Sequence, residues 1–305
     1  MEPIRFQMLT CAVEIEAADP AVRMALRYLA QDAVQAVAPV AAVRYEVVAA
    51  DGGGFAIRED GVEIEVAGDA DAVMACIYHH AHDAAHRSLP PHLRLHAGSA
   101  RLDGRRFVVV GGKNAGKTTL MIRLAFDGFE VEADECILIL EDGQTLPFPR
   151  RFHIKPGSFD VVPELQAFKS RMPVLQVPPT SIHAFAPSDA GLSWRLAPGR
   201  ADAVIFLDGG HGGPTKLRSI QAVEAAQRLA GHATMPERSR RWLGVLFDFV
   251  GRAANFVLTN GSPHESAAAI RDGLTKQRCI RPASRTSPPS PLNRSDVEGR
   301  DVTAV

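Results

Sequence analysis

One glycine-rich segment constrains this chain more than any other. It follows an apolar run typical of a buried strand, Phe107 to Val110, and it precedes an apolar helical pattern from Leu120 to Ala125. Residues 111–118, GGKNAGKT, fit the pattern G-x-x-x-x-G-K-[ST] of a phosphate-binding loop. Inward-turned N–H groups of such a loop, together with the N-terminus of the next helix, bind anions. We therefore predict a strand, a P-loop and a helix that bind a nucleotide.

Two side chains of this loop carry specific chemistry. Lys117 supplies a flexible positive charge for the β- and γ-phosphates, and the Thr118 hydroxyl suits a Mg²⁺ shell. ATP and Mg²⁺ are therefore the expected cofactors. A glycine turn without a ligand is the simpler alternative. The predicted nucleotide-binding residues are Gly111, Gly112, Lys113, Asn114, Ala115, Gly116, Lys117, Thr118 and Thr119.

Composition sets the class of protein. The 305 residues suffice for one large or two modest domains, and the formal net charge of -1 gives no general attraction to nucleic acid or to an anionic membrane. The four cysteines form no C-x-x-C pair, no apolar run reaches the length of a membrane span, and the first residues lack a signal-peptide pattern. We expect a cytoplasmic protein with no nucleic-acid or membrane partner.

Residues 1–92 have the pattern of a small N-terminal α+β unit without a catalytic signature. Asp19 and Pro20 open a helix whose apolar stripe continues to about Val37, and a second helix spans 68–88. The expected strands are Ile4 to Leu9, Cys11 to Ile15, Val43 to Val48, Phe55 to Arg58 and Val62 to Val66.

A group of histidines lies on the second of these helices. His82 and His86 are one turn apart, which would allow both to reach one metal ion, and His79 and His80 lie beside them. The sequence has no H-E-x-x-H pattern here and no supporting carboxylate or cysteine at a suitable spacing. A solvated polar helix face is therefore the simpler interpretation.

Two strands flank the P-loop in the sequence. Leu93 to Ala100 alternates like a strand and carries His96, and a turn at 103–104 predicts antiparallel pairing with the P-loop strand. After the P-loop helix, Phe129 to Ala133 reads as a strand that ends in Asp134 and Glu135. In P-loop enzymes a carboxylate at such a position holds Mg²⁺ or serves as a base. An acidic turn that faces solvent is the alternative.

This order of motifs resembles the HPr kinase/phosphorylase superfamily, and most closely its divergent HPr-kinase-related members. The resemblance covers residues 93–158 and rests on His96, the P-loop, the pair Asp134-Glu135, the segment PFPR at 147–150 and the segment KPGS at 155–158. It implies an α/β fold of α+β character, with a P-loop core of the HPr kinase C-terminal domain type at 93–277.

The resemblance also implies roles for individual residues. Asp134 matches the catalytic base that accepts a serine hydroxyl proton, His96 matches the histidine that assists it, and Lys117 completes the catalytic set. Glu135 replaces the second Asp of the family pair and, with Thr118, would hold Mg²⁺. The family's downstream E-[IV]-R-G-L-G-type segment is not found here, so HPr itself is not implied as the acceptor.

Three further features bear on the site. The segment 148–158 offers Arg150, Arg151 and Lys155 for phosphates or the acceptor, and Ser158 as the cap of a helix that starts near residue 160. Asp208 ends an apolar strand and competes with Asp134 for Mg²⁺, and His211 follows in a glycine loop. The tail, 278–305, is rich in Pro, Ser and Arg and is predicted to be disordered.

The leading hypothesis is an ATP-dependent kinase that phosphorylates a serine-type hydroxyl of a peptide or protein, with the acceptor encoded nearby. The alternatives are an ATP-binding module that presents or regulates a partner in a peptide-modification system, and a small-molecule kinase. Members of the parent family form hexamers, which leaves a homo-oligomer open.

Overall fold

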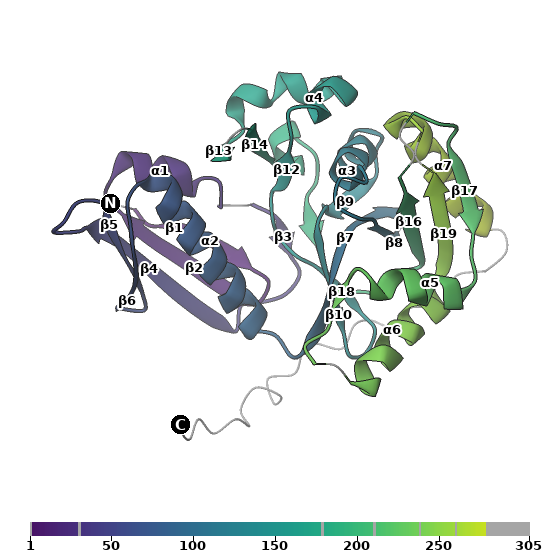
Figure 1. Ribbon diagram of the computed structural model, residues 1–305, viewed down its shortest axis with the longest axis horizontal. Helices are drawn as coiled ribbons and strands as arrows, with labels where there is room; N and C mark the ends of the chain where they lie inside the picture. The colour runs from purple at the N-terminus through teal and green to yellow at the C-terminus, as the bar shows by residue number, and fades with distance from the viewer. Residues whose placement is uncertain are drawn as a thin grey trace.

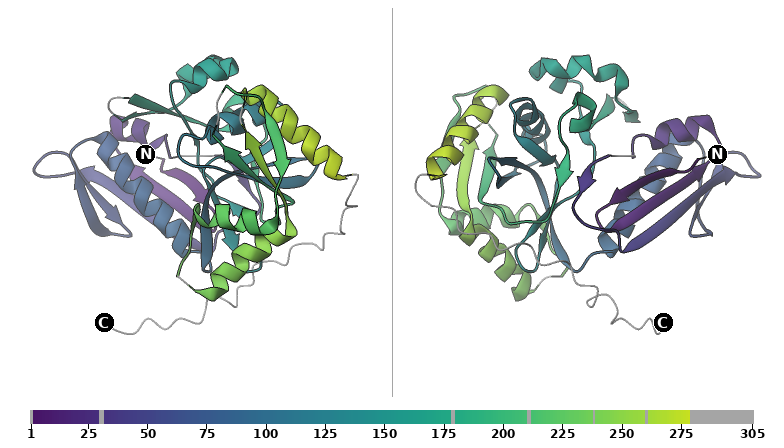
Figure 2. Two further views of the ribbon diagram at one scale, coloured as in Figure 1. Left: turned by 45° about the vertical axis from the view of Figure 1, so that its right-hand side comes forward. Right: turned by 180° about the vertical axis from the view of Figure 1, so that it is seen from behind.

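The computed structural model describes residues 2–29, 32–177, 180–209, 212–237, 239–259 and 261–278. Over these ranges the chain forms a mixed α/β fold with several sheets (Figure 1). A five-stranded sheet from the first part of the chain lies to one side of a nine-stranded sheet, as two further views show (Figure 2). None of the described helices is long and apolar enough to cross a membrane. Residue 211 and residues 279–305, most of the predicted tail, lie outside the described residues.

The five-stranded sheet has a polar face and a buried face. Its strands pair in the order β1 (Ile4–Met8), β2 (Cys11–Ala17), β4 (Ala41–Ala49), β5 (Phe55–Glu59) and β6 (Val62–Ala67). Alternate side chains such as Val13, Ile15 and Tyr45 are buried, because successive residues of a strand point to opposite faces. The helices α1 (Pro20–Leu26) and α2 (Ala70–Arg87) cover this apolar face (Figure 1). The predicted strands and the second helix are confirmed.

The first helix is shorter than the sequence pattern predicts. Asp19 caps it as expected, since its carboxylate accepts hydrogen bonds from the N–H groups of residues 21 and 22 at 2.8 and 3.0 Å. The helix nevertheless ends at Leu26 instead of near Val37. Residues Val34–Gln35 form the strand β3, which pairs in parallel with β15 (Arg195–Leu196). A tertiary pairing with a distant segment therefore overrides the local helical periodicity.

The nine-stranded sheet carries the glycine-rich segment near its centre. Its order is β11 (Thr145–Pro147), β10 (Cys136–Leu140), β7 (His92–Leu102), β8 (Arg105–Val110), β16 (Ala203–Asp208), β19 (Ala254–Thr259) and β17 (Lys216–Ser219), while β9 (Glu130–Ala133) and β18 (Ala233–Thr234) also pair with β7. Strand β8 is parallel to β16 and antiparallel to β7, with Ala97 opposite Val110. The predicted antiparallel pairing of the His96 strand with the P-loop strand is confirmed.

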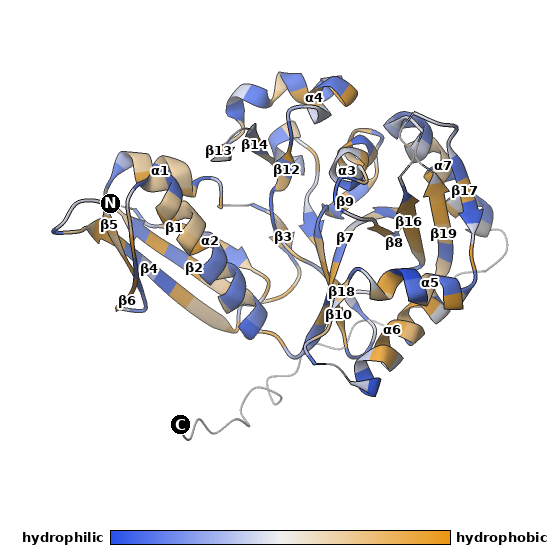
Figure 3. Ribbon diagram, in the orientation of Figure 1, coloured by the Kyte–Doolittle hydropathy of each residue, from blue (hydrophilic) through white to orange (hydrophobic). Residues whose placement is uncertain are grey.

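Helices cover both faces of this sheet. The helices α3 (Lys117–Phe126) and α7 (Pro263–Arg278) pack on one face, and α5 (Ala222–Ala230) and α6 (Arg240–Arg252) pack on the other. Because β8, β16 and β19 are buried on both sides, they are almost continuously apolar (Figure 3).

A smaller sheet lies beside α3 (Figure 1). Its order is β12 (Phe152–Ile154), β14 (Thr180–Phe185) and β13 (Val174–Val177). The short helix α4 (Ser158–Val161) follows β12, and 3₁₀ turns occur at Pro163–Ala167, Lys169–Arg171 and Pro187–Ala190.

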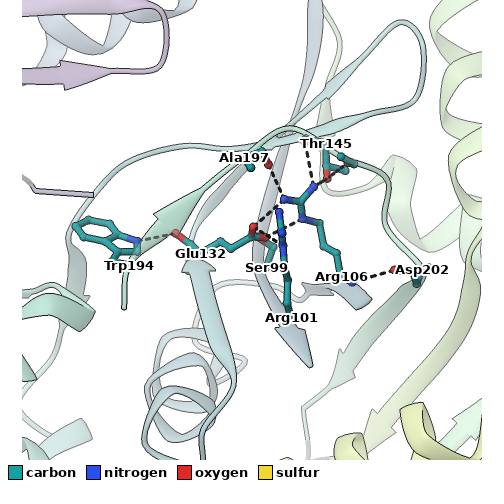
Figure 4. A network of polar contacts seen from close by, with 9 residues as sticks. Ser99, Arg101, Arg106, Glu132, Thr145, Trp194, Ala197 and Asp202 are labelled. Carbon is teal, nitrogen blue, oxygen red and sulfur yellow. Dashed lines mark hydrogen bonds and ion pairs between the residues drawn. The ribbon is translucent and has the colours of Figure 1, made fainter. Parts of the chain in front are cut away.

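A buried ion pair joins β8 to β9 (Figure 4). The Arg106 guanidinium donates to both carboxylate oxygens of Glu132, at 2.8 and 2.7 Å, and both side chains are almost fully buried. Ser99 donates to the same carboxylate at 3.0 Å, and Arg101 pairs with it at 2.9 Å. Further contacts of the pair extend the network to Thr145, Trp194, Ala197 and Asp202. The network therefore joins the strands β7, β8, β9 and β11 to the 194–202 segment.

We predict that Arg106→Met lowers the free energy of unfolding by about 3–5 kcal/mol, because it leaves the Glu132 charge buried with poorer compensation. Arg101→Met is the matched control. Its side chain is 27% exposed, compared with 3% for Arg106, and its removal should cost about 1 kcal/mol or less. Urea unfolding at pH 7.5 measures both, and equal losses would contradict a special role of Arg106.

Candidate functional site

The glycine-rich loop connects β8 to α3, which is the predicted strand–loop–helix arrangement (Figure 1). Gly116 has a φ of 83° and directly precedes the helix, a conformation that a residue with a Cβ rarely adopts. A Cβ at Gly111 would lie 3.1 Å from the Cβ atoms of Ala115 and Leu207. Both glycines are thus required by the path of the backbone. Gly112, Lys113 and Asn114 are exposed on the loop.

Lys117 connects the loop to His96. Its Nζ donates to the carbonyl oxygen of Gly111 at 2.8 Å and to Nε2 of His96 at 2.8 Å, and lies 3.4 Å from the carbonyl oxygen of Gly112. Because an ammonium group can only donate, His96 accepts through a neutral imidazole. Burial, with a smaller effect of Lys117, lowers the pKa of His96 to about 4, and burial lowers the pKa of Lys117 to about 8. The structure therefore brings these two predicted site residues into direct contact.

Thr118 and Asp134 form a second contact at the same place. The Thr118 hydroxyl donates to a carboxylate oxygen of Asp134 at 2.9 Å, and Asp134 is only 2% exposed. Burial raises the pKa of Asp134, although Arg150, the Thr118 hydroxyl and Lys117 act in the opposite direction. A hydroxyl and a buried carboxylate side by side are oxygen ligands suited to Mg²⁺, which usually takes one or two protein ligands and completes its shell with water and phosphate oxygens.

Glu135 lies next to Asp134 in sequence but has a different environment. Its carboxylate forms an ion pair with Arg150, and its side chain is 38% exposed. Its backbone carbonyl accepts a hydrogen bond from Ala97 at 3.0 Å, which holds the acidic pair against β7. Of the predicted site residues, His96, Lys117, Thr118 and Asp134 are connected by direct contacts, whereas Glu135 is engaged by an arginine. Its role as a Mg²⁺ ligand stays a prediction.

The segment 148–158 runs past the loop. Lys155 donates to the side-chain oxygen of Asn114 at 2.8 Å, and the hydroxyls of Ser158 and Thr119 are 3.2 Å apart. Arg151 instead pairs with Asp189 at 2.8 Å. The expectation that Ser158 caps a helix starting near residue 160 is wrong. Helix α4 begins at Ser158 itself, so the capping position belongs to Gly157, which has no side chain, and the Ser158 hydroxyl faces Thr119 instead.

The sequence did not single out His232 as part of the site. His96 N–H donates to the carbonyl oxygen of His232 at 3.1 Å, and the His232 side chain is close enough for Lys117 to add to the lowering of its pKa by burial. It follows α5 without any motif, so no local pattern indicated it. Asp208, the rival acid, is exposed at the end of β16 directly after Leu207, which approaches Gly111.

The histidines of α2 take part in packing. The rings of His82 and His86 both stack on Phe148, with centroids 5.0 Å away in each case. His80 contacts Glu59 at 2.9 Å, and His86 contacts His92 at 3.0 Å. Within the described residues, no group of three or more His, Cys, Asp or Glu side chains is placed to hold a metal ion.

Comparison with known proteins places the chain far from characterised sequences. No family model matches it, and no curated protein matches it. Among solved structures, it is similar to the Hpr(Ser) kinase/phosphatase from Coxiella burnetii, with a TM-score of 0.33 and 13% identity over 61% of this chain and 93% of that one. A likeness at this level indicates a distant relationship at most.

We predict that buried histidines make the fold sensitive to acid. Burial lowers the pKa of His82 to about 3, so the unfolded state binds a proton below about pH 6.5 that the folded state does not. Stability is therefore lost as the pH falls from about 6.5 toward 3. In His82→Phe, the loss between pH 7.5 and 5.0 should be smaller by about 1–2 kcal/mol, measured by urea unfolding. His79→Gln, at an exposed position of the same helix, is the control, and an equal effect would contradict the assignment.

We also predict that Asp134 destabilises the fold at high pH. Because burial raises the pKa of Asp134 in the folded state, the folded protein holds this proton more tightly than the unfolded chain does. The resulting stabilisation is complete below the unfolded-state pKa and is lost as the pH rises through the folded-state pKa. Asp134→Asn keeps an oxygen for the Thr118 hydroxyl and removes the buried charge. The variant should be at least as stable as the wild type at pH 6 and more stable at pH 8. Thermal unfolding at the two pH values measures this, and a less stable variant at pH 8 would refute it.

Proposed function

We propose that this protein is an ATP-dependent kinase that transfers the γ-phosphoryl group to a serine-type hydroxyl of a peptide or protein. One observation carries the proposal: the P-loop residues Lys117 and Thr118 are bonded directly to His96 and to the buried Asp134. A buried carboxylate and a cation thus lie next to the predicted phosphate-binding loop. The motif order shared with HPr-kinase-related sequences supports the same activity.

Each residue has a defined task in this reaction. Lys117 and the loop N–H groups bind the β- and γ-phosphates, and Lys155, held at Asn114, adds positive charge at the rim of the loop. Thr118 and Glu135 would hold Mg²⁺, which would supply charge neutralisation at the phosphates. Phosphoryl transfer depends mainly on this positioning and charge compensation.

Asp134 is the proposed base. It accepts the proton of the acceptor hydroxyl while the new bond from that oxygen to the γ-phosphorus forms and the bond from the γ-phosphorus to the ADP oxygen breaks. Its raised pKa strengthens it as a base, because a carboxylate with an ordinary pKa holds a proton weakly at neutral pH. His96 is neutral and accepts a hydrogen bond from Lys117, so it helps to position the lysine ammonium group.

The second candidate is an ATP-binding module that presents or regulates a partner without transferring phosphate. It is favoured by the ion pair of Glu135 with Arg150, since this carboxylate is engaged by a protein cation. If the protein is such a module, its function in the cell should survive Asp134→Asn but not Lys117→Ala. If the protein is a kinase, both substitutions should abolish that function.

For the kinase we expect Lys117→Ala to weaken ATP binding at least tenfold, because the loop loses its phosphate-binding cation. Asp134→Asn should keep ATP affinity within about threefold and lower the rate of phosphoryl transfer by roughly 10²–10⁴-fold, the range for loss of a general base. The measurements are calorimetric ATP binding and phosphopeptide formation with peptides encoded beside this gene.

Asp208→Asn is the comparison variant for this experiment, since it removes the rival acid. If it lowers transfer as strongly as Asp134→Asn does, the assignment of the base is wrong. If the wild type binds Mg-ATP but phosphorylates none of the peptides, the kinase fails and the binding module stands.

A further inference from the structure

Five side chains from three separate segments meet beside the acidic pair. We call them the seam cluster: Tyr28, Tyr78, His82, Arg150 and His153. Tyr28 follows α1, Tyr78 and His82 lie on α2, and the other two lie at or just before β12. Ring centroids are 5.3 Å apart for Tyr28 and His153 and 4.0 Å apart for Tyr78 and His82. The cluster therefore lines the junction between the helices of the five-stranded sheet and the β12 segment.

Arg150 connects the seam cluster to the candidate site. Its guanidinium donates to the Tyr78 hydroxyl at 2.9 Å and to Nδ1 of His153 at 3.2 Å, and it pairs with Glu135. Asp134, the neighbour of Glu135, is close enough to add to the raising of the Tyr28 pKa, which is mainly due to burial. The cluster thus borders the carboxylate that we propose as the base.

The hydrogen bonds of the two histidines define where their protons are. An arginine only donates, so Nδ1 of His153 accepts and the ring proton lies on Nε2. A backbone carbonyl only accepts, so Nδ1 of His82 donates to the carbonyl oxygen of Tyr78 at 2.6 Å and Nε2 carries the lone pair. Burial keeps both rings neutral by lowering the pKa of His82 to about 3 and that of His153 to about 2.

Four atoms of the cluster are buried without a hydrogen-bond partner: Tyr28 Oη, His82 Nε2, Arg150 Nε and His153 Nε2. The Tyr28 side chain is buried almost completely, with 5% exposure. Proteins satisfy the large majority of their buried polar groups, so four such atoms in one place indicate polar groups that a ligand completes. These atoms are covered by protein, and a ligand enters when α2 and β12 separate locally. That separation breaks the hydrogen bond between Arg150 and the Tyr78 hydroxyl, whereas the four unpaired atoms have no protein hydrogen bonds to lose.

The chemistry of these atoms selects a neutral group. Tyr28, Arg150 and His153 offer three donors, and His82 offers one acceptor. The charge of Arg150 is already balanced by Glu135, and Asp134 adds negative potential, which disfavours a carboxylate or phosphate. A peptide group matches the set, because its carbonyl oxygen accepts up to two hydrogen bonds from the donors and its N–H donates to His82.

We propose that the seam cluster binds a main-chain peptide group of the acceptor, adjacent to the hydroxyl that receives the phosphoryl group. This inference rests on the proposed kinase function and assigns recognition of the main chain of its peptide acceptor to the seam cluster. It gives the N-terminal helices a role in acceptor recognition, which the P-loop strand and helix do not supply.

The first test measures binding without turnover. The full chain, labelled with ¹⁵N-histidine, is titrated at pH 7.5 with N-acetyl-L-serine N-methylamide, a blocked serine with two peptide groups. The Nε2 resonances of His82 and His153 should shift saturably, and sodium acetate at equal concentration should leave them in place. Tyr28→Phe should weaken the binding by about tenfold, the size expected for one hydrogen bond. Tyr45→Phe, which removes another buried tyrosine hydroxyl within the five-stranded sheet, should leave it unchanged.

The second test uses Mg-ATP and the serine peptide on which the wild type is most active. Tyr28→Phe should raise the KM for that peptide by about tenfold with kcat within about twofold, and Tyr45→Phe should change neither. A fall in kcat at constant KM would assign Tyr28 to the chemistry instead of to binding and would overturn the inference.

The two tests separate this inference from the proposed function. If no peptide is phosphorylated but the histidine resonances still shift with the amide, the kinase fails and the peptide-binding site stands. If peptides are phosphorylated while the resonances stay in place, or shift more strongly with acetate, the seam cluster is not a peptide site and the kinase stands.

Discussion

The buried ion pair between Arg106 and Glu132 sets the geometry on which the candidate site depends. Arg106 lies on β8 shortly before the P-loop, and Glu132 lies on β9 just before Asp134. Two charges in a protein interior are stable only with close, multiple hydrogen bonds, so this contact tolerates little sliding of one strand relative to the other. The position of the acid relative to the phosphate loop is thus determined by an interaction that touches neither.

Local patterns predicted the parts of the site that depend on neighbouring residues. The apolar run before Gly111, the glycine at 116 with its positive φ, and the apolar helix face after Lys117 are all properties of one short segment. The antiparallel return of the His96 strand followed from the turn that joins it to β8. The structure places His96 against Lys117 and Asp134 against Thr118, while their roles stay a prediction.

Tertiary contacts decided what the sequence did not reveal. The predicted helix does not continue to Val37 because Val34 pairs with the strand β15, and helical periodicity carries no information about that partner. His232 lies in a turn that has no motif, and its carbonyl oxygen accepts a hydrogen bond from the backbone N–H of His96. Arg150 forms an ion pair with Glu135. The stacking of His82 and His86 on Phe148 likewise joins segments distant in sequence, so the predicted solvated helix face is wrong for these two rings, which pack instead.

The contacts of Lys117 make the loop a selective filter for anions. Its ammonium already has two backbone carbonyls and an imidazole as acceptors, and a ligand must replace this set to draw the lysine toward itself. A small anion with one or two oxygens would replace the existing hydrogen bonds of the Lys117 ammonium group with others that are no stronger. A polyphosphate chain would form these contacts and, at the same time, accept hydrogen bonds from the loop N–H groups. In the proposed kinase, discrimination against small inorganic anions would therefore begin at Lys117, before any nucleotide base is recognised.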